Sequence, residues 1–421
     1  RRLQTKGMTM HRRFLYLALG FLLLLLFGTI NSWSVFIGPL EAEFGWQRTQ
    51  TSSVFTVTMC CFCIGNLAAG ALSARTSARV GLGIAAALSA AGFVLASFTT
   101  TLPFIYVSYG VLCGIAVGMG TNGVMSIVLP WFPDRQGAAS GMLLMGIGFG
   151  SLLLGPAVTA LLGFAGWRVT FRLLGVAFGA LLGIGALVLH EPRPSAIPAT
   201  RAGGQPSGAA SQTVVPHAAA EIDTRSMLRS SAFWGFFAWA ALIGAGGLAV
   251  VGNAVPAAQD VLIASGMDAN AAVMPATLAM GAISVLNGLA RPLAGWTWDR
   301  AGSRIPLRVI PAVYALSMVL CAAGSLTALF PVLVAGFLLL GMAHGASQSV
   351  TSALVRTFFG ARHYSANYAC AQCNLMAAAL VGPMMAGAVR SATGSYLACY
   401  LALVLFAAVA FAAARIIKKP A

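Results

Sequence analysis

One arginine lies deep inside an apolar segment, where a charge is costly. Arg291 precedes Asp299, at the end of that segment, by about 12 Å of helix. An ionised group near the centre of a bilayer costs about 2.5 to 3.5 kcal/mol, and a guanidinium can hold a carboxylate with a bidentate fork. The nine Asp and Glu residues all fall in loops or at helix ends. Arg291 therefore predicts a site for a small organic anion. The alternative is a cap on the backbone carbonyls of a neighbouring broken helix.

Other polar residues in apolar segments are candidates for the same site. Asn287 lies one turn before Arg291 and could orient the guanidinium or bind the substrate. His344 and Gln348 are spaced i and i+4, so they share a helix face; His344 could donate to the anion or take up a proton, or the pair could only join two helices. The further candidates, each alone also compatible with helix packing, are Asn31, Trp33, Asn122, Asn253 and Asn374.

No residues are spaced for catalysis or for a cofactor. The chain has no phosphate-binding Gly-x-x-x-x-Gly-Lys-Ser/Thr sequence and no nucleophile, base and orienter set, so we expect neither an ATP-driven pump nor an enzyme. The eight cysteines lie in apolar runs, including Cys370-Ala-Gln-Cys373, and small residues of that kind usually serve helix packing in membranes. We expect no metal and no cofactor.

The composition is that of an integral membrane protein. Hydrophobic residues make up 59% of the chain and charged residues 8%, too few to cover a soluble surface. The net charge of +16 does not indicate a nucleic-acid partner, because the basic residues lie in short loops between apolar runs. Arg12 and Arg13 precede a run, Leu15–Phe27, that continues without a cleavage site, so we interpret it as a first transmembrane helix.

The apolar runs predict an all-α protein with twelve transmembrane helices in two sets of six. We expect an amino-terminal bundle at 1–190, a flexible cytoplasmic linker at 191–230, rich in Pro, Ala, Gly and Ser, and a carboxy-terminal bundle at 231–421. The predicted spans are 14–38, 51–73, 80–98, 103–128, 138–162, 169–190, 232–258, 270–297, 306–329, 331–354, 366–389 and 394–415.

The basic residues predict the orientation, because cytoplasmic loops carry an excess of Lys and Arg. With the amino terminus inside, the cytoplasmic side receives all of the 25 Lys and Arg residues except Arg48, Arg168, Arg172, Arg291 and Arg390. We expect both termini in the cytoplasm and the protein in a bacterial-type inner membrane. Arg172 lies within reach of the outer interface, and we interpret it as structural.

Motifs repeat between the two sets of helices. Trp131-Phe132, Arg135 and Gly155-Pro156 match Phe358-Phe359, Arg362 and Gly382-Pro383 at one offset. Gly70, Arg75 and Arg79 match Gly295, Arg300 and Arg304 at another. A parallel repeat places the substrate between the halves, near the midplane.

Several motifs carry a family resemblance. Gly295-Trp-Thr-Trp-Asp299-Arg300-Ala-Gly302-Ser-Arg304 resembles the loop signature of the major facilitator superfamily. Two further stretches, Ser32-Trp33-Ser34-Val35-Phe36 and Trp131-Phe132-Pro133-Asp134-Arg135, look like the oxalate:formate antiporter family and the monocarboxylate transporters. The resemblance implies the major facilitator fold and exchange or symport of small carboxylates. It also implies a cytoplasmic gate formed by Asp299, Arg300, Arg304, Asp134 and Arg135.

The chain departs from these families at three positions. Ala74 replaces the signature aspartate in the first half, Leu375 stands where oxalate exchangers carry a lysine, and Asn287 stands where monocarboxylate transporters carry an aspartate. A dicarboxylate held by two cations is therefore not expected. We predict a secondary transporter of a small organic anion, a monocarboxylate, working as a monomer and either exchanging it for a counter-anion or coupling it to protons. The alternatives are a multidrug or neutral-solute effluxer and a non-transporting ligand sensor.

Overall fold

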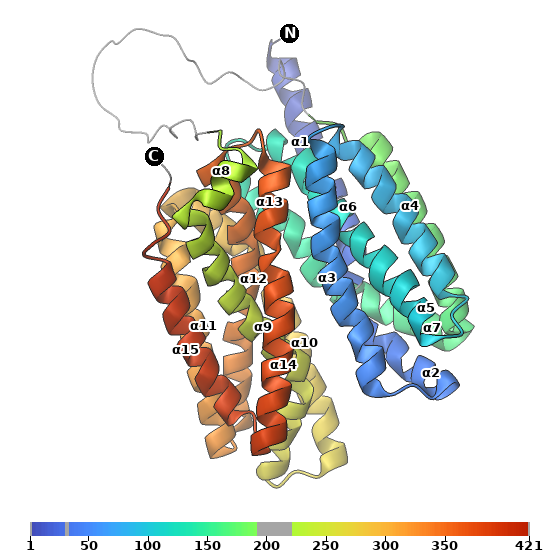
Figure 1. Ribbon diagram of the computed structural model, residues 1–421, viewed down its shortest axis with the longest axis vertical. Coiled ribbons are helices and arrows are strands. Elements are labelled where there is room, and N and C mark those ends of the chain that lie inside the picture. The colour runs from blue at the N-terminus through green and yellow to red at the C-terminus, as the bar shows by residue number, and fades with distance from the viewer. Residues whose placement is uncertain (1, 30–32, 192–220, 420–421) are drawn as a thin grey trace.

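The computed structural model describes residues 2–29, 33–191 and 221–419. Asn31 and most of the predicted linker lie outside the described residues. Figure 1 shows a molecule built of long, roughly parallel helices, with both ends of the chain at the same end of the molecule. This end is called the linker end below, and the opposite one the far end.

The helices follow the predicted spans. The first set comprises α1 (Arg2–Gly28), α2 (Ser34–Phe44), α3 (Arg48–Ser73), α4 (Ala78–Ala96), α5 (Leu102–Ile105), the π-helix η2 (Tyr106–Cys113), α6 (Gly114–Val128), the short 3-10 helix η3 (Leu129–Trp131) and α7 (Gln136–Val188). The second set comprises α8 (Thr224–Arg229), α9 (Ser231–Ala264), α10 (Ala269–Ala301), α11 (Arg304–Thr327), α12 (Phe330–Phe359), α13 (Tyr364–Gln372), α14 (Asn374–Thr393) and α15 (Leu397–Ala413).

Twelve spans result from these helices. Within the described residues, nine helical segments are long and apolar enough to cross a membrane. One of them, α7, supplies two spans, because Gly166 takes a φ of 75° and breaks the helix where the predicted spans 138–162 and 169–190 are separated. The apolar helices α1 and α15 complete the set. The predicted all-α fold with twelve transmembrane helices is confirmed.

Side chains define where two of the central helices begin. The Ser230 hydroxyl accepts from the backbone N–H of Phe233 at the start of α9. At the start of α10, Asp268 accepts from the backbone N–H of Asn270 at 2.9 Å. Both residues satisfy amides that have no partner within the helix. These caps mark the first turns of the two helices that carry Asn253 and Arg291.

The helices pack as two groups whose most extensive contacts are between two pairs of helices. In the first group α7 packs on α1 and α4, and in the second α10 packs on α12 and α14 packs on α9. Between the groups, α7 packs on α10 and α3 packs on α13, and Figure 1 shows α3 beside α13 near the linker end. The division at 190 and 231 stays a prediction that this packing accommodates.

Glycines allow α7 and α10 to approach closely. A Cβ added at Gly295 would lie 1.9 Å from the backbone oxygen of Gly137, and one added at Gly141 would lie 2.4 Å from the backbone oxygen of Arg291. Any larger side chain at these positions would separate the two helices. The close approach brings the backbone of α7 within reach of the Arg291 side chain.

Candidate functional site

Arg291 lies in the contact between α10 and α7. The residue is only 8% exposed. Its Nε and Nη2 donate to Oδ1 of Asn287, at 3.2 and 2.9 Å, and its Nη1 donates to the backbone oxygen of Leu144 on α7, at 2.5 Å. Asn287 and a carbonyl of α7 therefore both contact the guanidinium, while the orienting role of Asn287 and the role of a carbonyl cap stay predictions.

These contacts leave part of the guanidinium free. Of its five N–H groups three are used, and one remains on each terminal nitrogen, as an end-on carboxylate fork requires. In the part of the chain that the structure describes, no Asp or Glu forms an ion pair with Arg291. The ion pairs there include those of Arg13 with Asp134, Arg168 with Glu43, and Arg390 with Asp260. Arg291 is thus a buried cation with an unused N–H donor on each terminal nitrogen.

Two aromatic groups lie close enough to Arg291 to interact with it electrostatically, His344 of α12 and Tyr368 of α13. The hydroxyl of Tyr368 accepts from Nε2 of Gln372 at 2.8 Å, so its own O–H is available to donate. Gln372 is 2% exposed, and its Oε1 has no hydrogen-bond partner among the described residues. Sequence reasoning missed Tyr368 and Gln372, although their i, i+4 spacing on a polar helix is a usable signal.

His344 and Gln348 lie on one face of α12, as their spacing predicts, and each is 8% exposed. The His344 ring packs against α9, where a Cβ added at Gly247 would lie 2.3 Å from Nδ1. Within the described residues Nδ1 has no hydrogen-bond partner. His344 is therefore close to Arg291 with an unused ring nitrogen.

Asn374 lies where one transmembrane segment is interrupted, between α13 and α14. Its Nδ2 donates to the backbone oxygen of Ala371, and its Oδ1 is buried without a partner among the described residues. Leu375, next in the chain, is partly buried and packs on the apolar core. The position that carries a lysine in oxalate exchangers is thus occupied by an apolar side chain.

Asn122 lies in a hydrogen-bonded contact between the two groups of helices. Its Nδ2 donates to the backbone oxygen of Ser365 at 3.0 Å, and its Oδ1 accepts from the Ser365 hydroxyl at 2.6 Å. The same hydroxyl contacts that of Ser73 at 3.1 Å. In this conformation Asn122 joins α6 to α13 near the linker end rather than facing Arg291.

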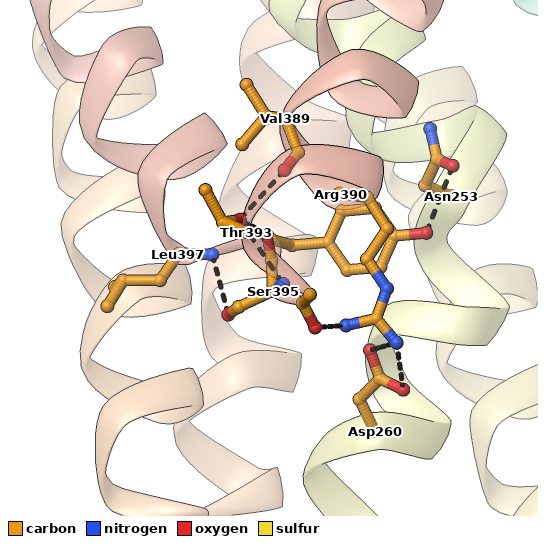
Figure 2. Close-up of polar contacts among 9 residues, drawn as sticks. Asn253, Asp260, Val389, Arg390, Thr393, Ser395 and Leu397 are labelled. Atoms are coloured by element: carbon orange, nitrogen blue, oxygen red, sulfur yellow. Dashed lines mark hydrogen bonds and ion pairs between the residues drawn. The ribbon is translucent and has the colours of Figure 1, made fainter.

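Asn253 belongs to a different network, at the far end (Figure 2). Its Oδ1 accepts from the Tyr396 hydroxyl at 3.2 Å. The guanidinium of Arg390 lies over the Tyr396 ring and pairs with Asp260 at 3.0 Å. The structure does not bring Asn253 together with Arg291.

Trp33 packs inside the first group of helices. It is 2% exposed, its ring centroid lies 4.4 Å from that of Tyr109, and its Nε1 donates to the backbone oxygen of Thr51. Its one polar group is therefore used within the first half. Asn31, also predicted for the site, lies outside the described residues.

Among the predicted gate residues, Asp299 joins the two halves directly. Its carboxylate oxygens accept from the backbone N–H groups of Gly137 and Ala138 at 2.9 and 2.8 Å, at the positive end of α7. Asp134 instead pairs with Arg13 of its own half, and Arg300 lies over the Trp296 ring of its own helix. Arg135 precedes α7, and Arg304 begins α11.

Known transporters resemble this chain in sequence. The family model of the Major Facilitator Superfamily matches residues 17–311. The chain is 26% identical over 366 residues to the oxalate:formate antiporter of Oxalobacter formigenes, which covers 86% of this chain and 82% of the antiporter. It is 26% identical over 383 residues to monocarboxylate transporter 13 of Bos taurus, covering 90% and 82%. The resemblance predicted from the motifs is confirmed.

Solved structures support the fold independently of those sequences. The proton:xylose symporter XylE, bound to 6-bromo-6-deoxy-D-glucose, matches 97% of this chain and 96% of its own with a TM-score of 0.69. The two sequences are 17% identical. At that identity the likeness shows the architecture alone.

Proposed function

The chain belongs to the Major Facilitator Superfamily, and from that premise we propose that it moves a small organic anion across the inner membrane by alternating access. Arg291 carries the proposal. It is a buried guanidinium with an unused N–H on each terminal nitrogen and no ion-pair partner in the described residues. A carboxylate supplies both the missing charge and the missing acceptors.

We propose a monocarboxylate as the substrate. The first reason is that the proposed site is built on the single cation Arg291, while Leu375, which stands where oxalate exchangers carry a lysine, is an apolar residue packed on the core. The second is that the relatives include an oxalate:formate antiporter and monocarboxylate transporters. Tyr368 and His344 then provide further hydrogen-bond donors beside the anion, and Asn287 holds the guanidinium in place.

In this proposal the linker end faces the cytoplasm, as the excess of basic residues there predicts. The hydrogen bonds of Asp299 and of Asn122 join the halves at that end, so in this proposal the conformation described is closed toward the cytoplasm. Rocking of the two halves would break these contacts and present Arg291 to the cytoplasm. With no carboxylate paired to Arg291 among the described residues, exchange of one anion for another is the simplest coupling.

A thermal-shift screen of the purified protein tests the substrate class. Formate, acetate, lactate, pyruvate, oxalate and neutral analogues are compared, because a ligand that binds only the folded state raises the unfolding temperature. We expect stabilisation by at least one monocarboxylate that is lost in Arg291→Gln and kept in Arg172→Gln. The control arginine lies at the far end, where it donates to Ser97. Stabilisation by hydrophobic amines alone would favour drug efflux and contradict the proposal.

A further inference from the structure

A stripe of polar residues follows one face of α12 from the level of Arg291 toward the linker end. His344, Gln348, Ser352 and Arg356 succeed one another at intervals of four residues, and each is at most 8% exposed. Twelve residues of helix separate the first from the last, which is about 18 Å. A polar stripe this long in a membrane helix is costly unless it faces a polar partner or a path.

A second stripe, on α13, faces the first. The Tyr364 hydroxyl and the Ser352 hydroxyl lie 2.8 Å apart. The rings of Tyr364 and Tyr368 are stacked, with centroids 5.3 Å apart and an interplanar angle of 13°. Because Tyr368 also interacts with Arg291, the two tyrosines connect the level of the candidate site to the level of Ser352.

Arg356 ends this stripe and is a second buried cation. Its guanidinium lies over the ring of Tyr364, with Cζ 5.7 Å from the centroid. It is 8% exposed, and in the described part of the chain its Nε has no hydrogen-bond partner and no carboxylate forms an ion pair with it. The sequence predicts Arg356 on the cytoplasmic side, and its burial at the end of α12 is a feature that the structure adds.

The segment that follows the linker lies beside Arg356. Glu221 is close enough to it to interact electrostatically, while its Oε2 accepts from the backbone N–H of Arg362 at 2.8 Å. The side chain of Asn367 holds the same segment, accepting from Thr224 and donating to the backbone oxygen of Ile222. A carboxylate is thus fixed near Arg356 without contacting it.

We propose that Arg356 is a second binding site for the transported carboxylate, on the linker side of Arg291. The inference rests on the proposed function. In it, the anion leaves Arg291 past the Tyr368 and Tyr364 hydroxyls and reaches Arg356 when the linker end opens. Glu221 competes with the anion for Arg356 and so favours its release. In the conformation described here, the Arg356 guanidinium rests on the Tyr364 ring.

The test measures transport separately from each side of the membrane. Right-side-out vesicles present the far end to added substrate, and inverted vesicles present the linker end. The probe is the radiolabelled monocarboxylate that gives the largest thermal shift in the screen. We expect Arg356→Gln to raise the half-saturating concentration about tenfold in inverted vesicles, the loss of one charge-assisted contact. The half-saturating concentration in right-side-out vesicles should stay unchanged.

Arg172→Gln is the matched control and should change neither value. An unchanged value for Arg356→Gln in inverted vesicles would overturn the second site, as would an equal rise on both sides, which a structural role produces. Failure of the proposed function looks different, because Arg291→Gln would then transport normally from both sides.

A second variant covers the case in which Arg356→Gln does not fold. Glu221→Gln keeps an acceptor for the Arg362 N–H and removes the charge that competes for Arg356. We expect a half-saturating concentration about threefold lower in inverted vesicles and no change in right-side-out vesicles. No change in either preparation, or a rise in the inverted one, would overturn the proposal.

Discussion

A buried guanidinium needs both charge compensation and hydrogen-bond acceptors. Among the described residues, Arg291 has acceptors for some of its N–H groups and no carboxylate that compensates its charge. Asn287 and the Leu144 carbonyl take three of its N–H groups. The sequence predicted the pairing of Asn287 with Arg291, because spacing within one helix fixes which side chains meet. It could not predict the contact of Arg291 with the Leu144 carbonyl, because that contact depends on how separate helices are rotated against each other.

Asn287→Asp should convert this site from one that binds an anion to one that excludes it. The added carboxylate would pair with Arg291 and take the place of the substrate. We expect substrate affinity to fall by at least tenfold at pH 7 and to recover partly on acidification, when the new group is protonated. Binding is followed by thermal shift against pH, with Asn253→Asp as a control outside the site. Equal affinity at pH 7 would contradict the assignment.

At the scale of elements, helix ends are as informative as helix faces. Asp299 accepts from the first amides of α7 across the contact between the halves, and Glu43 near the end of α2 contacts Arg168 at 2.6 Å and Trp167. The sequence placed these carboxylates at helix ends correctly. It could not show which helix each one would meet, since a loop position leaves the direction of the side chain open.

Asp299→Ala should loosen the start of α7. The amides of Gly137 and Ala138 would lose their acceptor, and a carboxylate would be lost from the positive end of the helix dipole. We expect hydrogen exchange at residues 137–138 to accelerate about tenfold, measured by mass spectrometry. Asp134→Ala is the control, because that carboxylate pairs with Arg13 and not with α7. Equal exchange in the two variants would refute the capping role.

Glu43 gives a pH dependence with a defined sign. Hydrogen bonds from Arg168 and from Trp167 lower the pKa of the Glu43 carboxyl below its ordinary value. Its contribution is therefore present above the pKa of the unfolded chain and is lost as the pH falls through the folded pKa. We expect Glu43→Gln to lower the unfolding temperature slightly at pH 7, with the difference vanishing below about pH 4. Glu191→Gln, at an exposed carboxylate elsewhere, should show no such trend.

At the scale of the whole molecule, the two halves repeat each other but close by different means. On one side Asp299 caps α7, and on the other, where Ala74 replaces the aspartate, the Asn122 amide and the Ser73 hydroxyl hold Ser365. The number of spans and their order could be predicted, because hydropathy is a local property of the chain. The cytoplasmic placement of the basic residues stays a prediction. The contact of Asn122 and Ser73 with Ser365 could not be predicted, since these small polar residues resemble those that serve ordinary helix packing.

Ala74→Asp should restore the symmetry. Gly70, one turn earlier, already lies against Ala366 of α13, so the added carboxylate would reach the first amides of that helix. We expect the outward-open conformation to be favoured, with slower exchange and a lower half-saturating concentration from the far end, measured in right-side-out vesicles. Faster anion exchange in Ala74→Asp would contradict the expectation that a carboxylate at this position holds the linker end closed.

Counterflow in proteoliposomes tests most directly whether Arg291 binds the transported anion, with wild type, Arg291→Gln and Arg172→Gln compared at equal protein content. Vesicles loaded with an unlabelled monocarboxylate are diluted into the labelled acid, and uptake above that of empty vesicles is recorded. We expect rapid uptake for wild type and Arg172→Gln and none for Arg291→Gln. Uptake by Arg291→Gln with wild-type affinity would contradict the claim that this arginine binds the transported anion.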